Sequence, residues 1–171
     1  MMDLRIRNAR PEDAEAVVRI LNPIIEARVF TVLDKTFTVE EEREFITAFP
    51  ERGIFLVAVR QPDQRIVGFQ NLEPFATYTR AFAHVGVMGT YVDGEMRRQG
   101  VARRLFQGMF DLAPAKGYEK IFTFVRADNQ PALHAYLRQD FQIIGTARRH
   151  AKVDGAYVDE VLIERFLDQP S

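Results

Sequence analysis

The stretch Arg97–Phe106, RRQGVARRLF, has residue types and a spacing suited to binding a phosphate. It follows a predicted strand that ends at Val92, and a helical pattern of apolar residues begins within it. The first turn of a helix has backbone amides without helical partners, at the positive end of the helix dipole. Gly100 and Ala102 lack the bulk that would keep a pyrophosphate away from these amides, and arginines can add charge-assisted bonds. The stretch therefore predicts either an anion site or an ordinary solvated helix start.

Two familiar phosphate loops do not fit this stretch. A Walker loop is excluded because no Gly-Lys-Ser/Thr follows the glycine. A Rossmann fingerprint is excluded because only one glycine is present and no N-terminal βαβ unit surrounds it.

The composition is that of a globular protein of 171 residues, and we expect one domain over residues 1–171. A formal net charge of -1 argues against a nucleic-acid partner. There is no cysteine, which excludes a disulfide, a thiolate zinc site and a cysteine nucleophile, and no His, Asp or Glu spacing predicts a metal. The opening MMDLRIRNARPED does not read as a signal peptide, and no apolar run approaches the roughly 20 residues of a membrane span. We expect a cytoplasmic protein.

Periodicity, caps and turns predict the elements that must position this loop. Strands are expected at 4–9, 53–59, 65–72, 83–92, 120–125, 141–153 and 157–166. Helices are expected from Pro11 to about residue 25, from Thr38 to about 48, over 98–116, and from Asp128 or Asn129 to about 139. This order predicts a mixed α+β fold, with a mostly antiparallel central sheet flanked by helices.

Three ordered stretches together resemble the GNAT superfamily of acetyl-CoA-dependent N-acetyltransferases: TYVDGEMRRQGVARRL, ADNQPALHAYLRQDF and GAYVDEVLIERF. The family loop Arg/Gln-x-x-Gly-x-Gly/Ala is matched by Arg97, Gly100 and Ala102, and the family Asn-x-x-Ala followed by an aromatic residue is matched by Asn129, Ala132 and Tyr136. The opening IRNARPEDAEAVVRILNPIIE and the ending YVDEVLIERF look most like the phosphinothricin acetyltransferase branch, which acetylates small amino acids and analogues.

The resemblance implies an acetyl-CoA site in the opening between the central strand and its neighbour. Its pyrophosphate loop would comprise Arg97, Arg98, Gln99, Gly100, Val101, Ala102 and Arg103. The backbones of Tyr91 and Val92 would bind the pantetheine arm, and Asn129 would contact the CoA arm. Many members have glycine where this chain has Arg98, and the usual glycine before Phe141 is Asp140.

Acetyl transfer to an amine needs an acid for the leaving thiolate and a base for the ammonium. Tyr136 is the candidate acid, since the resemblance places it near the sulfur and a tyrosine can protonate a thiolate. The branch has a base glutamate in the central strand where this chain has Val87. Glu73 and then His84 are the candidate bases, and a base acting through water is equally compatible.

The acceptor pocket is expected to involve Phe75, Tyr78 and Arg80, with Arg28 as a second arginine able to hold a carboxylate. The implied reaction is a direct, sequential transfer to a small amino acid or analogue, and the branch implies a homodimer. Acetylation of a protein or peptide amine is one alternative. A non-catalytic CoA-binding module is another, supported by Val87 in place of the base.

Overall fold

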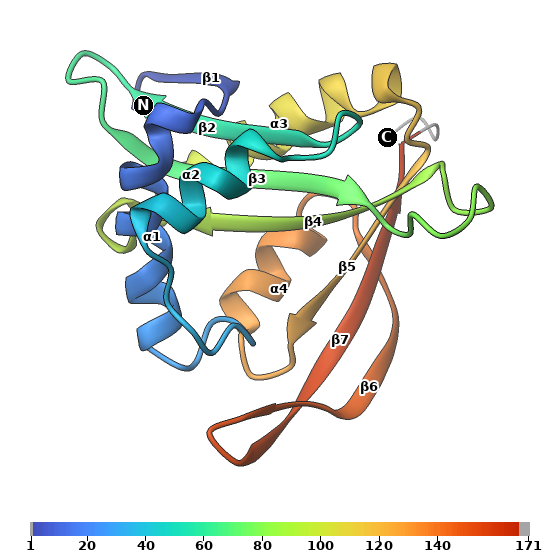
Figure 1. Ribbon diagram of the computed structural model, residues 1–171. Coiled ribbons are helices and arrows are strands. Elements are labelled where there is room, and N and C mark those ends of the chain that lie inside the picture. Colours follow the sequence, from blue (N-terminus) through green and yellow to red (C-terminus); the bar gives the residue numbers. More distant parts are fainter. Residues whose placement is uncertain (1, 168–171) are drawn as a thin grey trace.

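The computed structural model describes residues 2–167 of the chain. Its regular elements, in chain order, are β1 (Leu4–Asn8), α1 (Ala14–Glu26), α2 (Val39–Thr47), β2 (Ile54–Arg60), β3 (Ile66–Pro74), β4 (Val85–Val92), α3 (Val101–Leu112), β5 (Lys120–Arg126), α4 (Gln130–Leu137), β6 (Gln142–Val153) and β7 (Ala156–Phe166). This order is the predicted one (Figure 1).

One seven-stranded sheet runs through the molecule in the order β1-β2-β3-β4-β5-β7-β6. The pair β4–β5 is parallel, and the other five pairs are antiparallel. The predicted mixed, mostly antiparallel sheet flanked by helices is therefore confirmed.

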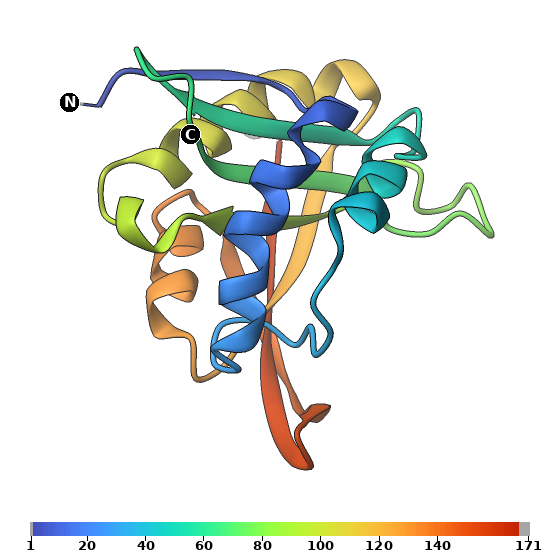
Figure 2. The ribbon, with the colours of Figure 1, turned by 60° about the vertical axis from the view of Figure 1, so that its left-hand side comes forward.

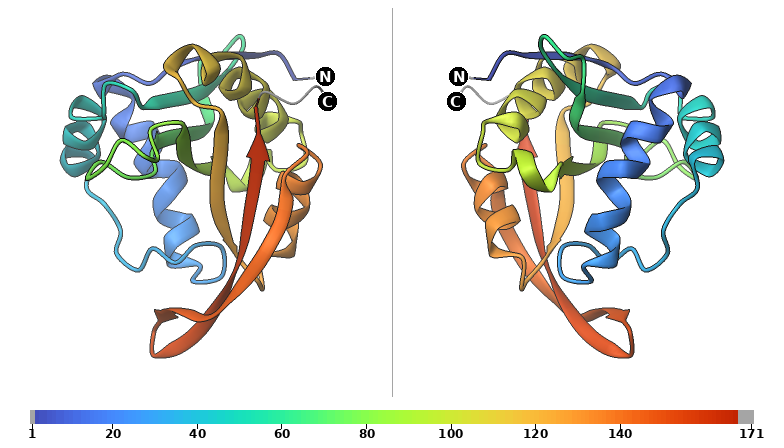
Figure 3. Two further views of the ribbon diagram at one scale, coloured as in Figure 1. Left: turned by 90° about the vertical axis from the view of Figure 1, so that its right-hand side faces the viewer. Right: turned by 90° about the vertical axis from the view of Figure 1, so that its left-hand side faces the viewer.

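The helices cover both faces of the sheet. Figure 3 shows α1 and α2 on one side and α3 and α4 on the other. Two apolar clusters fill the layers: one packs the inner side of α1 against Phe69 of β3, and the other packs α3 and α4 against Leu72 of β3 and Met88 of β4. Because successive strand residues point to opposite faces, these contacts fix the face of every residue in β3 and β4.

Two helix starts follow the predicted capping chemistry. The Thr38 hydroxyl accepts a hydrogen bond from the Glu41 amide at 3.1 Å, and the Glu41 carboxylate accepts one from the Thr38 amide at 2.8 Å. Asn129 caps α4 by accepting from the Ala132 amide at 3.3 Å. Both satisfy amides that would otherwise lack a partner.

Helix α3 is shorter than the predicted span of 98–116. It begins at Val101 because two residues before it are left-handed, Arg98 with φ 61° and Gly100 with φ 84°. Gly100 is thus the N-cap, not part of the first turn as predicted. The helix ends at Leu112, and a separate 3₁₀ turn follows at Pro114–Lys116, where the proline cannot donate a helical hydrogen bond.

The link between α1 and α2 crosses toward the start of α4. The Arg126 guanidinium donates to the carbonyls of Arg28 and Thr31 at 2.8 and 3.1 Å, and the Asn129 amide donates to the Phe30 carbonyl at 3.1 Å. Hairpin β6–β7 extends beyond the rest of the sheet (Figure 2). Its turn residue Asp154 pairs with Arg28 at 3.5 Å.

Candidate active site

Strands β4 and β5 separate after a short parallel pairing. Val85–Val87 pair with residues 120–122, and no pairing is recorded beyond them in the described part of the chain. The Thr123 hydroxyl, buried at this fork, donates to the Met88 carbonyl at 2.7 Å. In Figure 1, β4 and β5 diverge from the fork, and α4 lies between them. The divergence leaves part of the β4 edge without a strand partner.

The loop Asp93–Gly100 connects the far end of β4 to α3. No side chain caps α3, and its first helical bond is donated by the Arg104 amide to the Gly100 carbonyl at 3.1 Å. The amides of residues 101–103 therefore lack helical partners and lie at the positive end of the helix. A Cβ at Gly100 would meet no atom within 4 Å, so the space beside these amides is open. This end of α3 fits a phosphate group.

Asp93 anchors this loop. Sequence reasoning missed this residue. Its buried carboxylate accepts hydrogen bonds from Arg65 at 2.8 Å, Arg19 at 3.0 Å and the Glu95 amide at 3.1 Å. Burial raises the pKa of Asp93, but these three bonds outweigh burial and hold it below its ordinary value. An aspartate directly after a strand and before a glycine is the signal that was available.

The predicted loop residues divide by position. Arg97, Arg98, Gln99 and Arg103 are exposed, whereas Val101 is buried in the core under α3. The Arg97 guanidinium lies 4.3 Å from the ring centre of Phe30, in the α1–α2 link. The Gln99 side chain donates to the Glu95 carbonyl at 3.1 Å. The exposed arginines flank the helix start in sequence, and Val101 can offer only its amide.

Tyr91 and Val92, the two residues predicted to bind the pantetheine arm, direct their backbone groups to opposite sides of β4. The Asp93 amide donates to Val67 of β3, and Tyr91 pairs with Phe69. Because antiparallel residues alternate between facing their partner and facing away, Tyr91 directs its backbone toward β3. Val92 and Thr90 direct theirs toward the opening. Val92 is thus the member of the predicted pair whose amide and carbonyl face the opening.

Tyr136 lies under the opening, on the α3/α4 face. It is buried, packs edge-on against Phe106 and Phe141, and donates its hydroxyl proton to Thr90 Oγ1 at 3.0 Å. Burial raises the pKa of Tyr136 strongly, and the bond with Thr90 lowers it. The hydroxyl is therefore neutral and held at β4, in the middle of the unpaired edge.

Glu73 of β3 and Val87 of β4 are direct neighbours on adjacent strands. The two residues pair in register, and both lie on the α1/α2 face. Paired residues of this kind have Cβ atoms about 5 Å apart. Burial raises the pKa of Glu73 above its ordinary value. Glu73 thus places a carboxylate beside Val87, on the neighbouring strand.

Tyr91 adds a hydroxyl to the same face. Its ring stacks on Phe69 with centres 4.8 Å apart, and a Cβ placed on Gly89 would lie 3.3 Å from its hydroxyl oxygen. The side chain therefore runs along β4 over Gly89, toward Val87. Burial raises the pKa of Tyr91, a hydrogen bond with Thr31 lowers it, and nearby carboxylates raise it further.

Glu42 is a second carboxylate that sequence reasoning missed. It lies on the buried side of α2, one turn before Ile46, and is 5% exposed. Burial raises its pKa to about 7, and its charge raises the pKa of Tyr91. The spacing Val39, Glu42, Ile46 could have found it, since these positions share one helix face.

Four of the other predicted residues lie away from the α1/α2 face that carries Glu73, or make contacts elsewhere. His84 is exposed at the closed end of the fork, where its carbonyl accepts from Glu119 and Lys120. Tyr78 is 84% exposed, and Arg80 is also exposed in the same β3–β4 loop. Arg28 is engaged with Asp154 and with the Asp34 carbonyl.

Phe75 does lie beside the candidate base. Its ring meets those of Phe82 and Phe122 edge-on, with centres 5.2 and 5.8 Å apart. Phe122 is the β5 partner of Val87, so this aromatic group adjoins Glu73 at the fork.

Asn129 has both ends of its amide engaged, the oxygen with Ala132 and the nitrogen with Phe30. Its recorded contacts thus hold α4 and the α1–α2 link together. Any contact with a CoA arm would be additional.

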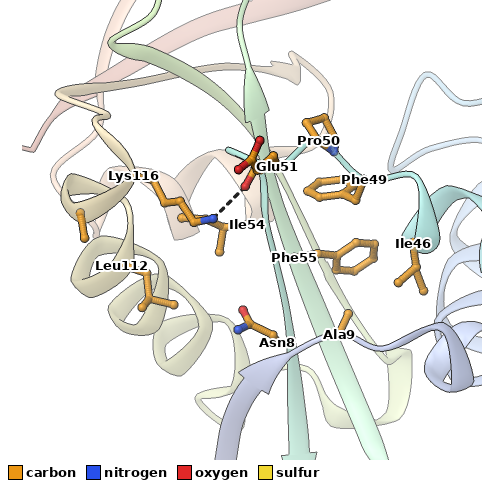
Figure 4. A pocket seen from close by; sticks show the side chains of 12 residues that line it. Asn8, Ala9, Ile46, Phe49, Pro50, Glu51, Ile54, Phe55, Leu112 and Lys116 are labelled. Carbon is orange, nitrogen blue, oxygen red and sulfur yellow. Dashed lines mark hydrogen bonds between the residues drawn. The ribbon is translucent and has the colours of Figure 1, made fainter.

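Figure 4 shows a surface hollow at the β1 edge of the sheet. It lies between the end of β1, the end of α2 and α3, and is lined by Asn8, Phe49, Phe55 and Leu112 among others. Lys116 spans it by donating to the Glu51 carbonyl at 2.8 Å. It is bordered by β1 and β2, at the β1 edge of the sheet, whereas β4 and β5 lie in the middle. The described residues contain no group of acids, histidines or cysteines able to hold a metal. Nor is any helix among them long and apolar enough to cross a membrane.

Comparison with known proteins agrees with this geometry. Residues 21–141 match the model of the Acetyltransferase (GNAT) family, so the chain belongs to that family. It is 27% identical to the L-amino acid N-acetyltransferase AaaT of Escherichia coli (strain K12), over 96% of this chain and 99% of that protein. It is 24% identical to the phosphinothricin N-acetyltransferase of Streptomyces coelicolor, over 96% and 97% of the two chains.

Among solved structures, the fold matches a GNAT superfamily phosphinothricin acetyltransferase from Sinorhizobium meliloti in complex with AcCoA. The TM-score is 0.87 at 15% identity, covering 98% of this chain and 93% of that one. At this identity the match concerns the fold.

Proposed function

We propose that the chain is an acetyl-CoA-dependent N-acetyltransferase that transfers the acetyl group directly to the amino group of a small amino acid or analogue. The observation that carries this proposal is the set of groups along β4 from the fork onward: the Glu73 carboxylate on one face at the fork, the Tyr136 hydroxyl on the other face, and bare helix amides at the far end. The names of the relatives, which specify phosphinothricin and L-amino acids, support the acceptor class.

Acetyl-CoA supplies the activated acetyl thioester. The amides of residues 101–103 bind the pyrophosphate, with exposed arginines Arg98 and Arg103 at the rim. The free backbone of Val92 binds the arm along the edge of β4. The S. meliloti structure in complex with AcCoA supports this use of the fold.

Two side chains move the protons. Glu73 removes a proton from the acceptor ammonium, directly or through water, since burial raises its pKa toward the range useful for a base. Tyr136 gives its proton to the departing thiolate, whose free thiol has a pKa of about 8.5. The aromatic group at Phe75 forms the wall of the acceptor side.

The rival with a specific observation behind it is a CoA-binding module without activity, because Val87 stands where the branch has its base. Thiol release from acetyl-CoA, measured with a panel of free amino acids, amines and a lysine peptide, separates the possibilities. Turnover on amino acids supports the proposal, and turnover on the peptide alone would replace the acceptor class. Tight acetyl-CoA binding with no turnover on any acceptor would establish the binding module.

A further inference from the structure

Gln70 is a polar side chain with no exposed surface, placed on the α3/α4 face of β3. Its Nε2 donates to Thr90 Oγ1 at 2.9 Å, and its Oε1 has no hydrogen-bond partner among the described residues. A buried amide oxygen without a partner destabilises the folded state. An apolar residue would avoid this cost, so the amide at this position calls for an explanation.

Thr90 is where two hydrogen bonds meet. Its hydroxyl oxygen accepts from Gln70 at 2.9 Å and from Tyr136 at 3.0 Å. A hydroxyl has two acceptor positions and one proton. With both acceptor positions filled, the proton of Thr90 itself is left to be donated. Thr90 is also one of the β4 residues whose backbone faces the opening.

We propose that Thr90 is a positioning residue that acts through Tyr136, and that Gln70 holds the Thr90 hydroxyl in place for this purpose. The inference rests on the proposed function, in which Tyr136 protonates the leaving thiolate. Before transfer, Tyr136 donates to Thr90. In the transfer step the O–H bond of Tyr136 breaks, an S–H bond forms, and the negative charge passes from sulfur to the phenolate oxygen. Thr90 then turns its own proton to that oxygen.

The surroundings of Tyr136 make such a donor necessary. The rings of Phe106 and Phe141 pack against it, and burial favours its neutral form. A phenolate left there without a donor would be a buried, unpaired charge. The Gln70 nitrogen can only donate, so it keeps one acceptor position of Thr90 filled and leaves the Thr90 proton for Tyr136. After product release the phenolate regains its proton from water.

A double-mutant cycle tests the inference. We expect Thr90→Val to lower kcat about tenfold, with KM for acetyl-CoA changed less than about twofold. Thr90→Ser, which keeps the hydroxyl, should retain most of the wild-type kcat. In the Tyr136→Phe background, Thr90→Val should have almost no further effect, because the group through which it acts is gone. Thr47→Val, which removes an exposed hydroxyl on α2, is the matched control.

Binding gives a second measurement that does not depend on turnover. CoA carries the thiol, and desulfo-CoA lacks it. Tyr136→Phe should remove the preference of the protein for CoA over desulfo-CoA, and Thr90→Val should reduce it. Desulfo-CoA should bind all variants with equal affinity, which also shows that they are folded.

The two hypotheses fail in different ways. If Tyr136→Phe lowers kcat but Thr90→Val leaves both kcat and the CoA preference unchanged, the role of Thr90 is wrong and the acetyltransferase stands. An equal loss from Thr90→Val with and without Tyr136 would also overturn it, since that is the result of a purely structural role. A protein that acetylates no amine at all overturns both.

Discussion

At the scale of single residues, two positions of the proposed phosphate loop, Arg98 and Gly100, have an unusual backbone conformation. Arg98 and Gly100 are both left-handed, with φ 61° and 84°. For any residue with a Cβ this conformation costs about 1 kcal/mol. The family often has glycine where this chain has Arg98, and the left-handed φ gives the physical reason for that preference.

Matched substitutions at these two positions should therefore have opposite effects on backbone strain. Arg98→Gly relieves backbone strain, so we expect stability within about 1 kcal/mol of the wild type or higher, while the loss of one exposed rim charge should weaken acetyl-CoA binding by no more than about fivefold. Gly100→Val introduces strain and fills the open space beside the helix amides, so acetyl-CoA affinity should fall at least about tenfold. Thermal unfolding and isothermal titration with acetyl-CoA measure both effects. Unchanged affinity in Gly100→Val would rule out the phosphate loop.

Glu73 sets an expectation for pH dependence. A base must be ionised, so kcat/KM should rise with pH through the pKa of Glu73, which burial moves above its ordinary value. Glu73→Gln should lower kcat/KM by about 10²-fold or more and remove this rise. Glu44→Gln, an exposed glutamate on α2, is the control. A pH rise that persists in Glu73→Gln but disappears in Glu42→Gln would transfer the base role to α2.

At the scale of elements, the buried carboxylate of Glu42 on α2 lowers the stability of the folded protein when it is ionised. Burial raises the pKa of Glu42 from its ordinary value of 4.5 to about 7. Between these two pH values the unfolded chain releases the proton while the folded chain keeps it, so the contribution of Glu42 to stability falls as pH rises through this window.

Glu42→Gln removes that dependence. Its stability relative to the wild type should increase between pH 4.5 and 7 and then level off, reaching roughly 1–2 kcal/mol once partial solvent screening is allowed for. Urea unfolding at several pH values measures the difference. Glu44→Gln should show no such trend, and a flat difference for Glu42→Gln would mean that its carboxylate is not desolvated.

Elements with a local chemical signal could be predicted, and those set by distant contacts could not. Thr38 and Asn129 mark helix starts by their own capping chemistry, and Asp154-Gly155 marks the last turn, so these elements lie where predicted. The start of α3 depends on the backbone conformation of Arg98, for which an arginine gives no sign.

The candidate site divides in the same way. The proposed phosphate loop and the candidate acid Tyr136 come from sequence motifs. The facing of Glu73 and Val87 follows from strand register, which no single strand reveals. The bonds of Thr90 with Gln70 and Tyr136 join residues 20 and 46 positions apart in sequence, so only the folded sheet brings them together.

At the scale of the whole molecule, β6 is an unpaired edge of the sheet with apolar side chains in contact with solvent. Ile143 and Ile144 are 53% and 49% exposed. Long, exposed edge strands pair readily with other chains. This surface supports the prediction that the protein forms a homodimer.

Ile144→Lys should therefore shift the protein from dimer to monomer, because a charge would be placed in the contact. Light scattering after size-exclusion chromatography measures the mass. Leu112→Lys, on an exposed apolar position of α3, should leave the mass unchanged. A wild-type protein that is monomeric at all concentrations would contradict the prediction.

The stacking of Arg97 on Phe30 has a kinetic consequence. Arg97 belongs to the proposed phosphate loop, while Phe30 belongs to the α1–α2 link, which also places Thr31 beside Tyr91 on the α1/α2 face. A pyrophosphate that draws Arg97 toward it changes the support of this link before an amine arrives. We therefore expect the two substrates to add in a fixed order, acetyl-CoA first. Product-inhibition patterns would then show CoA competing with acetyl-CoA alone, and Phe30→Ala would loosen this order.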